Sequence, residues 1–349
     1  MEILIVKLSS IGDVVHTLPS LDALRGAYPE SRITWLVEEN AHDIIKGHPC
    51  LDEIIVSRRK TWTKNLFRTS TCLSTVVEIL SFIKKLRSRE YDLVLDFQGL
   101  FKSGVLTRLS GGKRRVGYNK TRELSYLFLN ERVPPYNPDH HAVERYLDLV
   151  RYLDDKVNEP KFLIPLHNKD MERVRGFLCD NKIDNDVKII AVCPGSRWET
   201  KLWHQERFGS LCDKIIDKFD AMILFIGDRN DQSMIDAITS KMRRHALNTA
   251  GMFNLKELAF LLGSVDLMIT TDTGPMHIAS AMETPVVAIF GPTAPWRTGP
   301  YGNGHTPIKS KVACSPCFKK KCNTKECMAE ITVDHVFTSV SEKLFKTHP

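Results

Sequence analysis

The chain has 349 residues, which is too many for one ordinary hydrophobic core and fits two domains of roughly 150 residues each. Hydrophobic residues make up 42% and charged residues 26%, a balance typical of a soluble globular protein rather than a disordered one. No apolar run approaches the roughly 18 residues that a membrane-spanning helix needs, and the first residues carry no basic leader. We therefore expect a cytoplasmic protein with nine reduced cysteines, whose formal charge of +7 reflects either a slightly basic surface or an anionic partner.

Strand-like and helix-like patterns alternate along both halves of the chain. In the first half, strands are expected at 1–6, 32–37, 53–56 and 91–97, with helices at 12–25 and 75–87. In the second half, strands are expected at 188–193, 221–226, 266–270 and 285–290, with helices at 205–218, 254–262 and 275–282. This alternation predicts an α/β protein whose parallel sheets are covered by helices on both faces.

A domain boundary is expected where the apolar rhythm is interrupted. Pro160, Pro165 and the polar stretch 181–186 interrupt it, so we predict domains at 1–165 and 166–349. Two Rossmann-like, doubly wound domains facing each other would enclose a cleft. Ligands of such sheets bind outside the carboxyl ends of the strands, which is where the unusual segments of this sequence fall.

The first of these segments, residues 7–19, follows the first predicted strand and opens a helix. Ser9, Ser10 and Gly12 form a loop whose backbone can approach a ligand closely. Asp13 begins the helix and has two interpretations. It is either an N-terminal capping residue favoured by the helix dipole, or a carboxylate that takes a proton from an attacking hydroxyl.

The second segment, residues 194–203, follows the first strand of the second half. Ser196, Arg197 and Lys201 are residues that could bind a phosphate, with the lysine as a point charge and the arginine as a bidentate hydrogen-bond donor. The alternative is an exposed loop with ordinary basic residues.

The third segment, residues 270–279, ends a strand and opens a helix with Pro275 in its first turn. Thr273 and Gly274 would present backbone N–H groups at the positive end of that helix, which is a ready site for a diphosphate. His277 lies one turn further on, where a lone histidine is more often a packing residue than a catalyst.

Three motifs occur in order along the chain: Lys-x-Ser-Ser-x-Gly-Asp-Val-x-His-Thr-Leu-Pro at 7–19, Asp-Phe-Gln-Gly-Leu-Phe-Lys-Ser at 96–103, and Asp-Thr-Gly-x-x-His at 272–277. Together with Phe-Gly-Pro-Thr at 290–293, they resemble the lipopolysaccharide heptosyltransferase family. The stretches 58–64 and 141–145 are most similar to the first heptosyltransferase, which acts on Kdo-lipid A. The tail at 314–327 is closer to the second heptosyltransferase and other relatives.

This resemblance implies a glycosyltransferase B-type fold, an inverting transfer in one displacement, and no bound metal or cofactor. The N-terminal domain would hold Kdo-lipid A or another partial core acceptor, and the C-terminal domain would hold ADP-heptose. By match to the family motifs, Asp13 would be the base, Lys201 would contact phosphate, Asp272 would meet sugar hydroxyls, and Thr273 and Gly274 would meet the phosphates.

The nucleoside contacts are less constrained by the sequence. The acidic turn after the strand at 221–226 offers either Asp228 or Asp231 to the ribose, and the backbone near Met252 and Phe253 is expected at the adenine. The predicted donor set is Ser196, Arg197, Lys201, Asp228, Asp231, Met252, Phe253, Asp272, Thr273, Gly274 and His277.

Basic residues gather in the first half, which we expect to bind the acceptor. The predicted acceptor set is Ser10, Arg58, Arg59, Lys60, Lys64, Gln98 and Lys102. The segment 58–68 is expected to be a loop that faces lipid with Trp62, Leu66 and Phe67, so that the protein associates peripherally with the inner membrane; the alternative is a solvated surface. Nucleic acid is not expected as a partner, because no nucleic-acid-binding module is recognisable.

The tail carries four closely spaced cysteines, Cys314, Cys317, Cys322 and Cys327. This spacing allows a structural zinc site, but it lacks the usual paired knuckles, so reduced, packed thiols are favoured. Two other functions remain open. An NAD-dependent oxidoreductase is disfavoured because no strand is followed by G-x-G-x-x-G, and a non-catalytic sugar-nucleotide-binding protein is disfavoured by Asp13 and Lys201.

Overall fold

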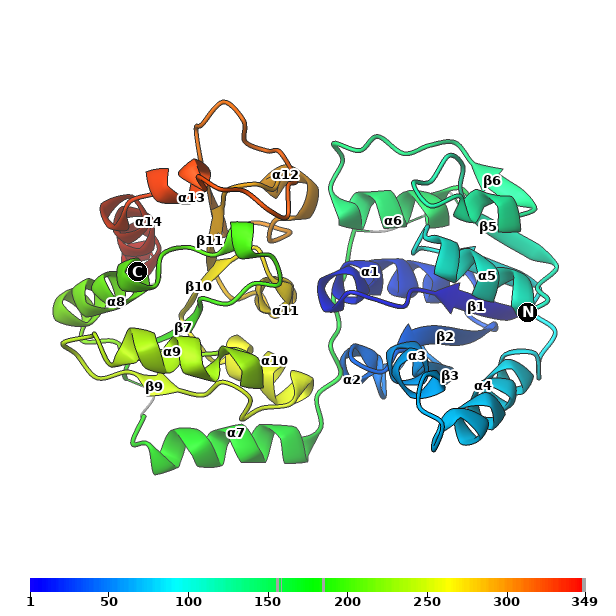
Figure 1. Ribbon diagram of the computed structural model, residues 1–349, viewed down its shortest axis with the longest axis horizontal. Coiled ribbons are helices and arrows are strands. Elements are labelled where there is room, and N and C mark those ends of the chain that lie inside the picture. Colours follow the sequence, from blue (N-terminus) through cyan, green and yellow to red (C-terminus); the bar gives the residue numbers. More distant parts are fainter. Residues whose placement is uncertain (155–156, 158, 184–185, 347–349) are drawn as a thin grey trace. The chain divides into compact units, whose positions relative to one another are not determined.

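A computed structural model describes residues 1–154, 157, 159–183 and 186–346 (Figure 1). The chain divides into two compact units, Met1–Pro165 and Leu166–Pro349, and each has its own six-stranded sheet. Two residues of the polar stretch 181–186, at 184 and 185, lie outside the described residues. In the described part of the chain, no helix is both long enough and apolar enough to cross a bilayer.

The first unit is built on a fully parallel sheet with the strand order β3-β2-β1-β4-β5-β6. Its strands are β1 (Glu2–Val6), β2 (Arg32–Glu38), β3 (Glu53–Ser57), β4 (Leu93–Asp96), β5 (Arg114–Tyr118) and β6 (Glu131–Val133). Its helices are α1 (Ile11–Ala27), α2 (His42–Ile45), α3 (Arg59–Leu66), α4 (Cys72–Leu86), α5 (Phe101–Leu109), the 3₁₀ turn η1 (Ser125–Phe128) and α6 (Ala142–Arg151).

The second unit repeats this plan with the order β12-β11-β10-β7-β8-β9. Its strands are β7 (Ile189–Cys193), β8 (Met222–Phe225), β9 (Leu247–Asn248), β10 (Leu267–Thr271), β11 (Val286–Phe290) and β12 (Thr306–Lys309). Its helices are α7 (Asn168–Asp180), η2 (Glu199–Lys201), α8 (Gln205–Phe219), η3 (Arg229–Asp231), α9 (Gln232–Thr239), α10 (Leu255–Gly263), α11 (Gly274–Ala281), α12 (Pro295–Thr298), α13 (Glu326–Glu330) and α14 (Val333–Lys346).

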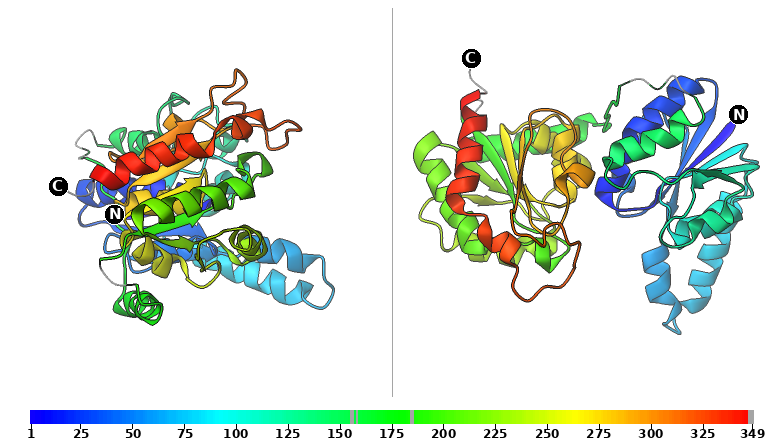
Figure 2. Two further views of the ribbon diagram at one scale, coloured as in Figure 1. Left: turned by 90° about the vertical axis from the view of Figure 1, so that its left-hand side faces the viewer. Right: turned by 90° about the horizontal axis from the view of Figure 1, so that it is seen from above.

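The central strands are buried on both faces, which explains their unbroken apolar sequences. Residues 3–6 of β1 and 190–192 of β7 are fully buried. Such strands form where helices cover both faces of a parallel sheet, as Figure 2 shows for each unit. The predicted α/β architecture with two doubly wound sheets is therefore confirmed.

The strand order determines where ligands can bind. In the first unit the order reverses direction between β1 and β4, and in the second unit it reverses between β7 and β10. The connections that leave these neighbouring strands run to opposite faces of the sheet, which opens a crevice at the carboxyl ends. The loops after all four strands contain predicted site residues.

One predicted loop is wrong. Most of the segment 58–68 is the helix α3, and Trp62 is buried with its ring 5.0 Å from that of Phe82 in α4. Trp62 is therefore a core residue of the first unit and does not face lipid, whereas Leu66 and Phe67 are exposed as expected.

Candidate active site

In the first unit, Asp13 is held by the loop after β1. Ser10 caps α1, and its backbone N–H and hydroxyl both donate to Asp13 Oδ2 at 2.9 Å. The other carboxylate oxygen, Oδ1, accepts a hydrogen bond from the Tyr146 hydroxyl at 3.0 Å. The side chain of Asp13 is still 36% exposed, so it caps the helix and also presents a carboxylate to a ligand.

Beneath this carboxylate lies a buried lysine. Lys7 directly follows β1, is 1% exposed, and donates to the Tyr146 hydroxyl at 2.6 Å and to the Phe97 carbonyl at 3.0 Å. Its ammonium lies 3.9 Å from Asp13 Oδ1. Lys7 and Tyr146 therefore form a chain of donors that ends on Asp13.

This chain determines the protonation state of Asp13. Burial by itself raises the pKa of Asp13, but the Lys7 charge and the donors on Ser10 and Tyr146 outweigh burial, so the pKa lies below its ordinary value. Burial and the Asp13 charge raise the pKa of Tyr146 well above its usual value, so the phenol keeps its proton. Burial lowers the pKa of Lys7 to about 8. At neutral pH, Asp13 is an ionised carboxylate.

The motif at 96–103 anchors this loop. Asp96 is buried and accepts hydrogen bonds from Gln98 N, Gly99 N and Ser103 Oγ at 3.0–3.1 Å. The Gln98 side-chain oxygen accepts from the backbone N–H groups of Leu8 and Ser9. Gln98 therefore shapes the loop after β1. Burial raises the pKa of Asp96 to about 6. Both of its carboxylate oxygens accept hydrogen bonds from within this motif.

Three of the predicted acceptor residues converge on a carboxylate at the end of β2. Glu38 is 2% exposed and pairs with Lys102 at 2.9 Å, Arg59 at 3.1 Å and Lys60 at 3.8 Å. Burial raises the pKa of Glu38, but the hydrogen bonds and charges of Lys102 and Arg59 more than reverse this effect. Lys102 also donates to the Ser9 hydroxyl, which joins this cluster to the Asp13 loop.

The other two basic residues of the acceptor set lie elsewhere. Arg58 pairs with Glu39 at 3.3 Å and with Glu78 of α4 at 2.7 Å. Lys64 is exposed in the last turn of α3. Neither contacts Glu38, so the structure does not bring all four basic residues of 58–64 together.

In the second unit, the loops after β7 and β10 contact each other. Lys201 Nζ lies 2.7 Å from Asp272 Oδ2, and the lysine is only 15% exposed. The Ser196 hydroxyl donates to the Asp272 carbonyl at 3.2 Å, while Arg197 is exposed in the same loop. Lys201, Ser196 and Asp272 thus form one polar cluster at the crevice of this sheet.

The helix α11 begins beside this cluster. Thr273 is its N-terminal cap, Gly274 is its first residue, and a proline lies in the first turn, as predicted. The first N–H groups of a helix have no partner within the helix and lie at its positive end. His277, one turn further on, is 8% exposed and packs inside the unit.

The acidic turn after β8 lies at the same edge of the sheet. Asp228 is exposed and caps η3 by accepting from Asn230 N, whereas Asp231 is half-buried and accepts from Asp228 N. A Cβ atom on Gly195 or Gly227 would lie 2.6–2.7 Å from the Asp231 carboxylate. Only glycine lets these two loops pack so closely around Asp231.

The predicted adenine segment follows β9. Met252 is 43% exposed, and its carbonyl accepts from Arg173 of α7 at 2.9 Å. Arg173 also pairs with the buried Glu257 of α10 at 3.0 Å, and the Phe253 ring packs edge-on against Phe177. The helix α7, which the sequence analysis did not predict, therefore packs against this segment and holds it through Arg173 and Phe177.

The chain is similar to known glycosyltransferases over most of its length. The sequence model of glycosyltransferase family 9 (heptosyltransferase) matches residues 79–328. The lipopolysaccharide heptosyltransferase 1 of Pseudomonas aeruginosa is 31% identical over 324 residues, covering 92% of this chain and 87% of that relative. This chain belongs to glycosyltransferase family 9.

Solved structures agree with this family assignment. The family 9 glycosyltransferase of Veillonella parvula superposes with a TM-score of 0.83 at 22% identity, covering 99% of this chain and 97% of that one. The E. coli heptosyltransferase WaaC with ADP superposes with a TM-score of 0.78 at 25% identity, covering 98% and 100%. The predicted glycosyltransferase B-type fold is confirmed, and the protein is a heptosyltransferase of lipopolysaccharide core synthesis rather than an oxidoreductase.

Sequence reasoning missed Lys7, Tyr146 and Glu38 as members of the glycosyltransferase's polar clusters. Lys7 and Glu38 stand at the carboxyl ends of β1 and β2, and a charged residue that ends an apolar strand was an available signal. Tyr146 lies on α6, whose apolar spacing at 143, 147 and 150 also predicts a helix. Nothing local pairs Tyr146 with Asp13, which is 133 residues away.

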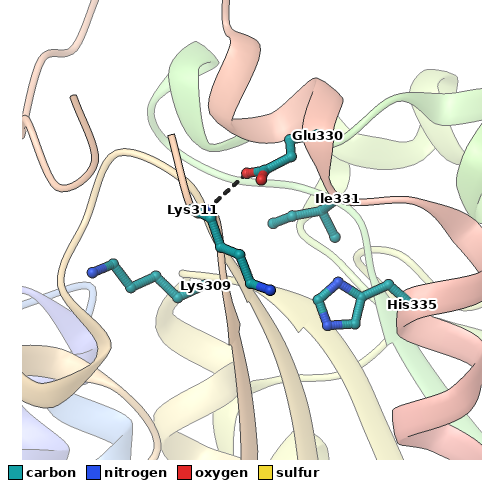
Figure 3. Close-up of a pocket in the computed structure, with 5 residues that line it drawn as sticks. All are labelled: Lys309, Lys311, Glu330, Ile331 and His335. Carbon is teal, nitrogen blue, oxygen red and sulfur yellow. Dashed lines mark hydrogen bonds between the residues drawn. The ribbon is translucent and has the colours of Figure 1, made fainter. Parts of the chain in front are cut away.

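The second unit also has a separate small pocket of about 100 Å³. Figure 3 shows the side chains that line it. It lies beside the end of β12 and the helices α13 and α14. Its lining residues are Lys309, Lys311, Glu330, Ile331 and His335. None of these five belongs to the predicted donor set, and Glu330 is engaged by the Lys311 N–H at 2.7 Å.

The tail carries four of the nine cysteines. Within the described residues, no three His, Cys, Asp or Glu side chains are grouped so that they could hold a metal ion. Cys314, Cys317, Cys322 and Cys327 are free thiols, of which only Cys327 is buried.

Proposed function

We propose that this heptosyltransferase moves heptose from ADP-heptose to Kdo-lipid A, with Asp13 as the base. The observation that carries the proposal is the ionised, partly exposed Asp13 carboxylate, held by Ser10 and Tyr146 at the crevice of the first sheet. The relative at 31% identity is named a lipopolysaccharide heptosyltransferase 1, which favours Kdo-lipid A over other core acceptors.

The second unit is the proposed donor domain, spanning residues 166–349. E. coli WaaC has been solved with ADP, which supports an ADP-sugar donor here. On donor binding, Lys201 would turn from Asp272 toward the diphosphate, and the N–H groups at Thr273 and Gly274 would bind phosphate oxygens, with Ser196 and Arg197 beside them. Asp272, released from this pair, would accept hydrogen bonds from sugar hydroxyls. The remaining proposed contacts are Asp228 or Asp231, Met252, Phe253 and His277.

The first unit, residues 1–165, is the proposed acceptor domain. Arg59, Lys60 and Lys102 are positioned by Glu38 next to the Asp13 loop, where they would bind the negative charges of a Kdo-bearing acceptor. Ser10, Gln98, Arg58 and Lys64 complete the proposed acceptor set. An acceptor of this kind is anchored in a bilayer, so the proposal includes peripheral association with the cytoplasmic face of the inner membrane.

The proposed reaction is a single displacement. The acceptor hydroxyl oxygen bonds to the anomeric carbon of heptose as the bond from that carbon to the diphosphate oxygen breaks. The hydroxyl proton passes to Asp13, and the negative charge leaves with ADP. Lys201 and the first N–H groups of α11 stabilise that charge, so the mechanism needs no metal ion. Attack from the side opposite the leaving group inverts the anomeric centre.

The test is to incubate the pure protein with ADP-heptose and Kdo-lipid A and to follow ADP release and product mass. We expect one heptose to be added, with inverted anomeric configuration by NMR, at a rate unchanged by EDTA. Transfer only to an acceptor that already carries heptose would show a heptosyltransferase II. No transfer to either acceptor would refute the proposed function.

A further inference from the structure

The helix α4 has two apolar faces, and only one of them is buried. Phe82 and Leu86 pack into the core of the first unit. On the outer face, Leu73, Val77 and Leu80 are 83%, 66% and 60% exposed. With Val76, which is 39% exposed, they occupy positions i, i+3, i+4 and i+7, which form one stripe along a helix. We call these four residues the outer stripe.

The connection between α3 and α4 extends this apolar surface. Phe67 is 88% exposed and Leu66 is 38% exposed at the end of α3. Val77 of the outer stripe also lines an open recess of about 530 Å³ beside α4. Figure 2 shows the two helices standing out from the sheet of their unit. The outer stripe is contiguous exposed apolar surface, which marks an interaction site.

Positive charge borders the outer stripe at both ends. Residues 58–87 contain eight lysines and arginines and one acidic residue, Glu78. Lys64 and Arg68 are exposed near Phe67, and Lys84, Lys85 and Arg87 are exposed at the end of α4. An apolar stripe between basic ends is the pattern of a helix that lies in the headgroup region of an anionic bilayer.

We propose that α3 and α4, residues 59–86, dock the protein on an anionic lipid bilayer, with the outer stripe and Phe67 inserted among the lipids. This deepens the proposed function, which requires an acceptor held in a membrane, but the outer stripe and its basic border carry it independently of any transfer. Lys64, Arg68 and Lys84 attract the headgroups, and the apolar side chains supply the lasting attachment.

A second copy of the chain is a poorer occupant of this surface. In a two-fold dimer the same patch faces itself. Because both ends of the outer stripe are basic, either a parallel or an antiparallel pairing of α4 helices would bring Lys84 and Arg87 or Lys64 and Arg68 against like charges. An anionic bilayer neutralises both ends at once.

The test measures sedimentation of the full-length protein with phosphatidylglycerol-containing vesicles and with neutral phosphatidylcholine vesicles. Leu73→Gln/Leu80→Gln changes two exposed side chains, so the fold should be retained, and we expect binding to anionic vesicles to weaken at least about tenfold. The matched control Leu127→Gln/Leu163→Gln replaces two leucines that are 59% and 45% exposed elsewhere on the same unit and should bind within twofold of the parent. Arg68→Gln/Lys84→Gln should lower the affinity for anionic vesicles roughly fivefold for each charge removed, and should leave binding to neutral vesicles unchanged.

Quenching of tryptophan fluorescence by brominated lipids measures whether a side chain is inserted in the bilayer. Tryptophan in Phe67→Trp should be quenched on anionic vesicles, and tryptophan in the control Leu127→Trp should not. Equal vesicle binding by the two double-leucine variants, or equal quenching at positions 67 and 127, would overturn the proposal. So would a dimer in solution that Leu73→Gln/Leu80→Gln dissociates.

Transfer to a deacylated, water-soluble acceptor separates membrane docking from catalysis. Leu73→Gln/Leu80→Gln should transfer heptose to this acceptor at the same rate as the parent. If the parent shows no transfer to any acceptor but still binds anionic vesicles, the proposed function is refuted and the membrane docking stands.

Discussion

At the scale of single residues, each polar cluster combines a buried charge with a more exposed one. Lys7 lies beneath Asp13, Glu38 lies beneath Lys60, and Asp272 lies beside Lys201. A buried charge is costly unless it is paired and hydrogen-bonded, so each one requires its partner. In the first unit, the pairing restricts the side chains of Asp13 and Lys60 before a ligand arrives. This restriction reduces the entropy lost on binding.

We expect Asp13→Asn to retain the fold and lose turnover. Asparagine keeps the size and can still accept a hydrogen bond from Ser10, so the cap on α1 remains, and Lys7 keeps its hydrogen bonds to the Phe97 carbonyl and the Tyr146 hydroxyl. A positioned base contributes about 10²–10⁴-fold in rate, which corresponds to roughly 3–5 kcal/mol of barrier. Single-turnover transfer assays, in which chemistry limits the rate, measure this loss.

The matched control is Asp22→Asn on the same helix, which should transfer heptose normally. Turnover by Asp13→Asn within about threefold of the parent would mean that Asp13 only caps the helix. In that case the base would have to be another carboxylate.

Asp96 should make folding stability depend on pH. Its folded pKa is raised by burial from 3.8 to about 6, so the unfolded chain ionises first and the folded state becomes less stable as pH rises from about 4 to 6. The full cost is about 3 kcal/mol above pH 6. Lys7, with a pKa of about 8, stays protonated throughout this range. Urea denaturation of the parent and of Asp96→Asn at pH 4.5 and pH 7 tests this.

The quantity that tests this prediction is the difference in unfolding free energy between the parent and Asp96→Asn. The free energy of unfolding of the parent, relative to Asp96→Asn, should fall between pH 4.5 and pH 7. A difference that does not change with pH would show that burial does not raise the pKa of Asp96.

At the scale of elements, helix starts and strand ends hold the polar residues. The first turn of α1 holds Asp13, the first turn of α11 follows Thr273, and the end of β2 places Glu38 beneath the start of α3. The helix α3 changes how the basic segment is tested. Arg59 compensates the buried Glu38, so its removal would disturb the fold as well as binding, whereas Lys60 and Lys64 project into solvent.

We therefore expect Lys60→Gln/Lys64→Gln to raise the acceptor KM roughly three- to tenfold at low salt, and less at high salt, because exposed charges are screened. Affinity for ADP, measured by calorimetry, should not change. The control Lys113→Gln/Arg114→Gln removes two positive charges from another exposed part of the same unit. An acceptor KM equal to that of the parent at low salt would show that these lysines do not bind the acceptor.

At the scale of the whole molecule, the two units repeat one topology. Each sheet has six parallel strands, and in each the polar residues follow the two strands at which the order reverses. The units differ in the chemistry of these loops, with a carboxylate offered in the first and a lysine next to a helix start in the second. This difference suits an acceptor hydroxyl in the first unit and a diphosphate in the second.

ADP should therefore protect only the second unit from hydrogen exchange. In the full-length protein we expect slower exchange at 194–201, 227–231 and 272–278, and no change at 7–13. Lys201→Gln should weaken ADP binding about 10–100-fold, because a hydrogen bond to a charged group contributes about 1.5–3 kcal/mol. Its control is Lys241→Gln, which removes an exposed partner of Glu206 in the same unit. Protection at 7–13 with none at 272–278 would reverse the proposed assignment of the two units.

Much of this protein follows from its sequence alone. The alternation of apolar runs with helical spacing predicts two α/β sheets, and the turns after the strands indicate Asp13, Lys201 and Asp272. Such signals are local, because a strand has a period of two residues, a helix has a period of 3.6, and a loop requires particular residues. The predicted loop at 58–68 failed because its polar sequence hides a short helix that is held by a single buried residue, Trp62.

The pairings were decided only by the tertiary structure. Tyr146 reaches Asp13 across 133 residues, and Lys102 reaches Glu38 across 64 residues. These distances close because strand order and helix packing bring the carboxyl ends of β1, β2 and β4 to one edge, which no local pattern encodes. The same holds for α4, whose sequence is apolar on two sides. Only packing on the sheet determines that Phe82 and Leu86 are buried while Leu73 and Leu80 remain exposed.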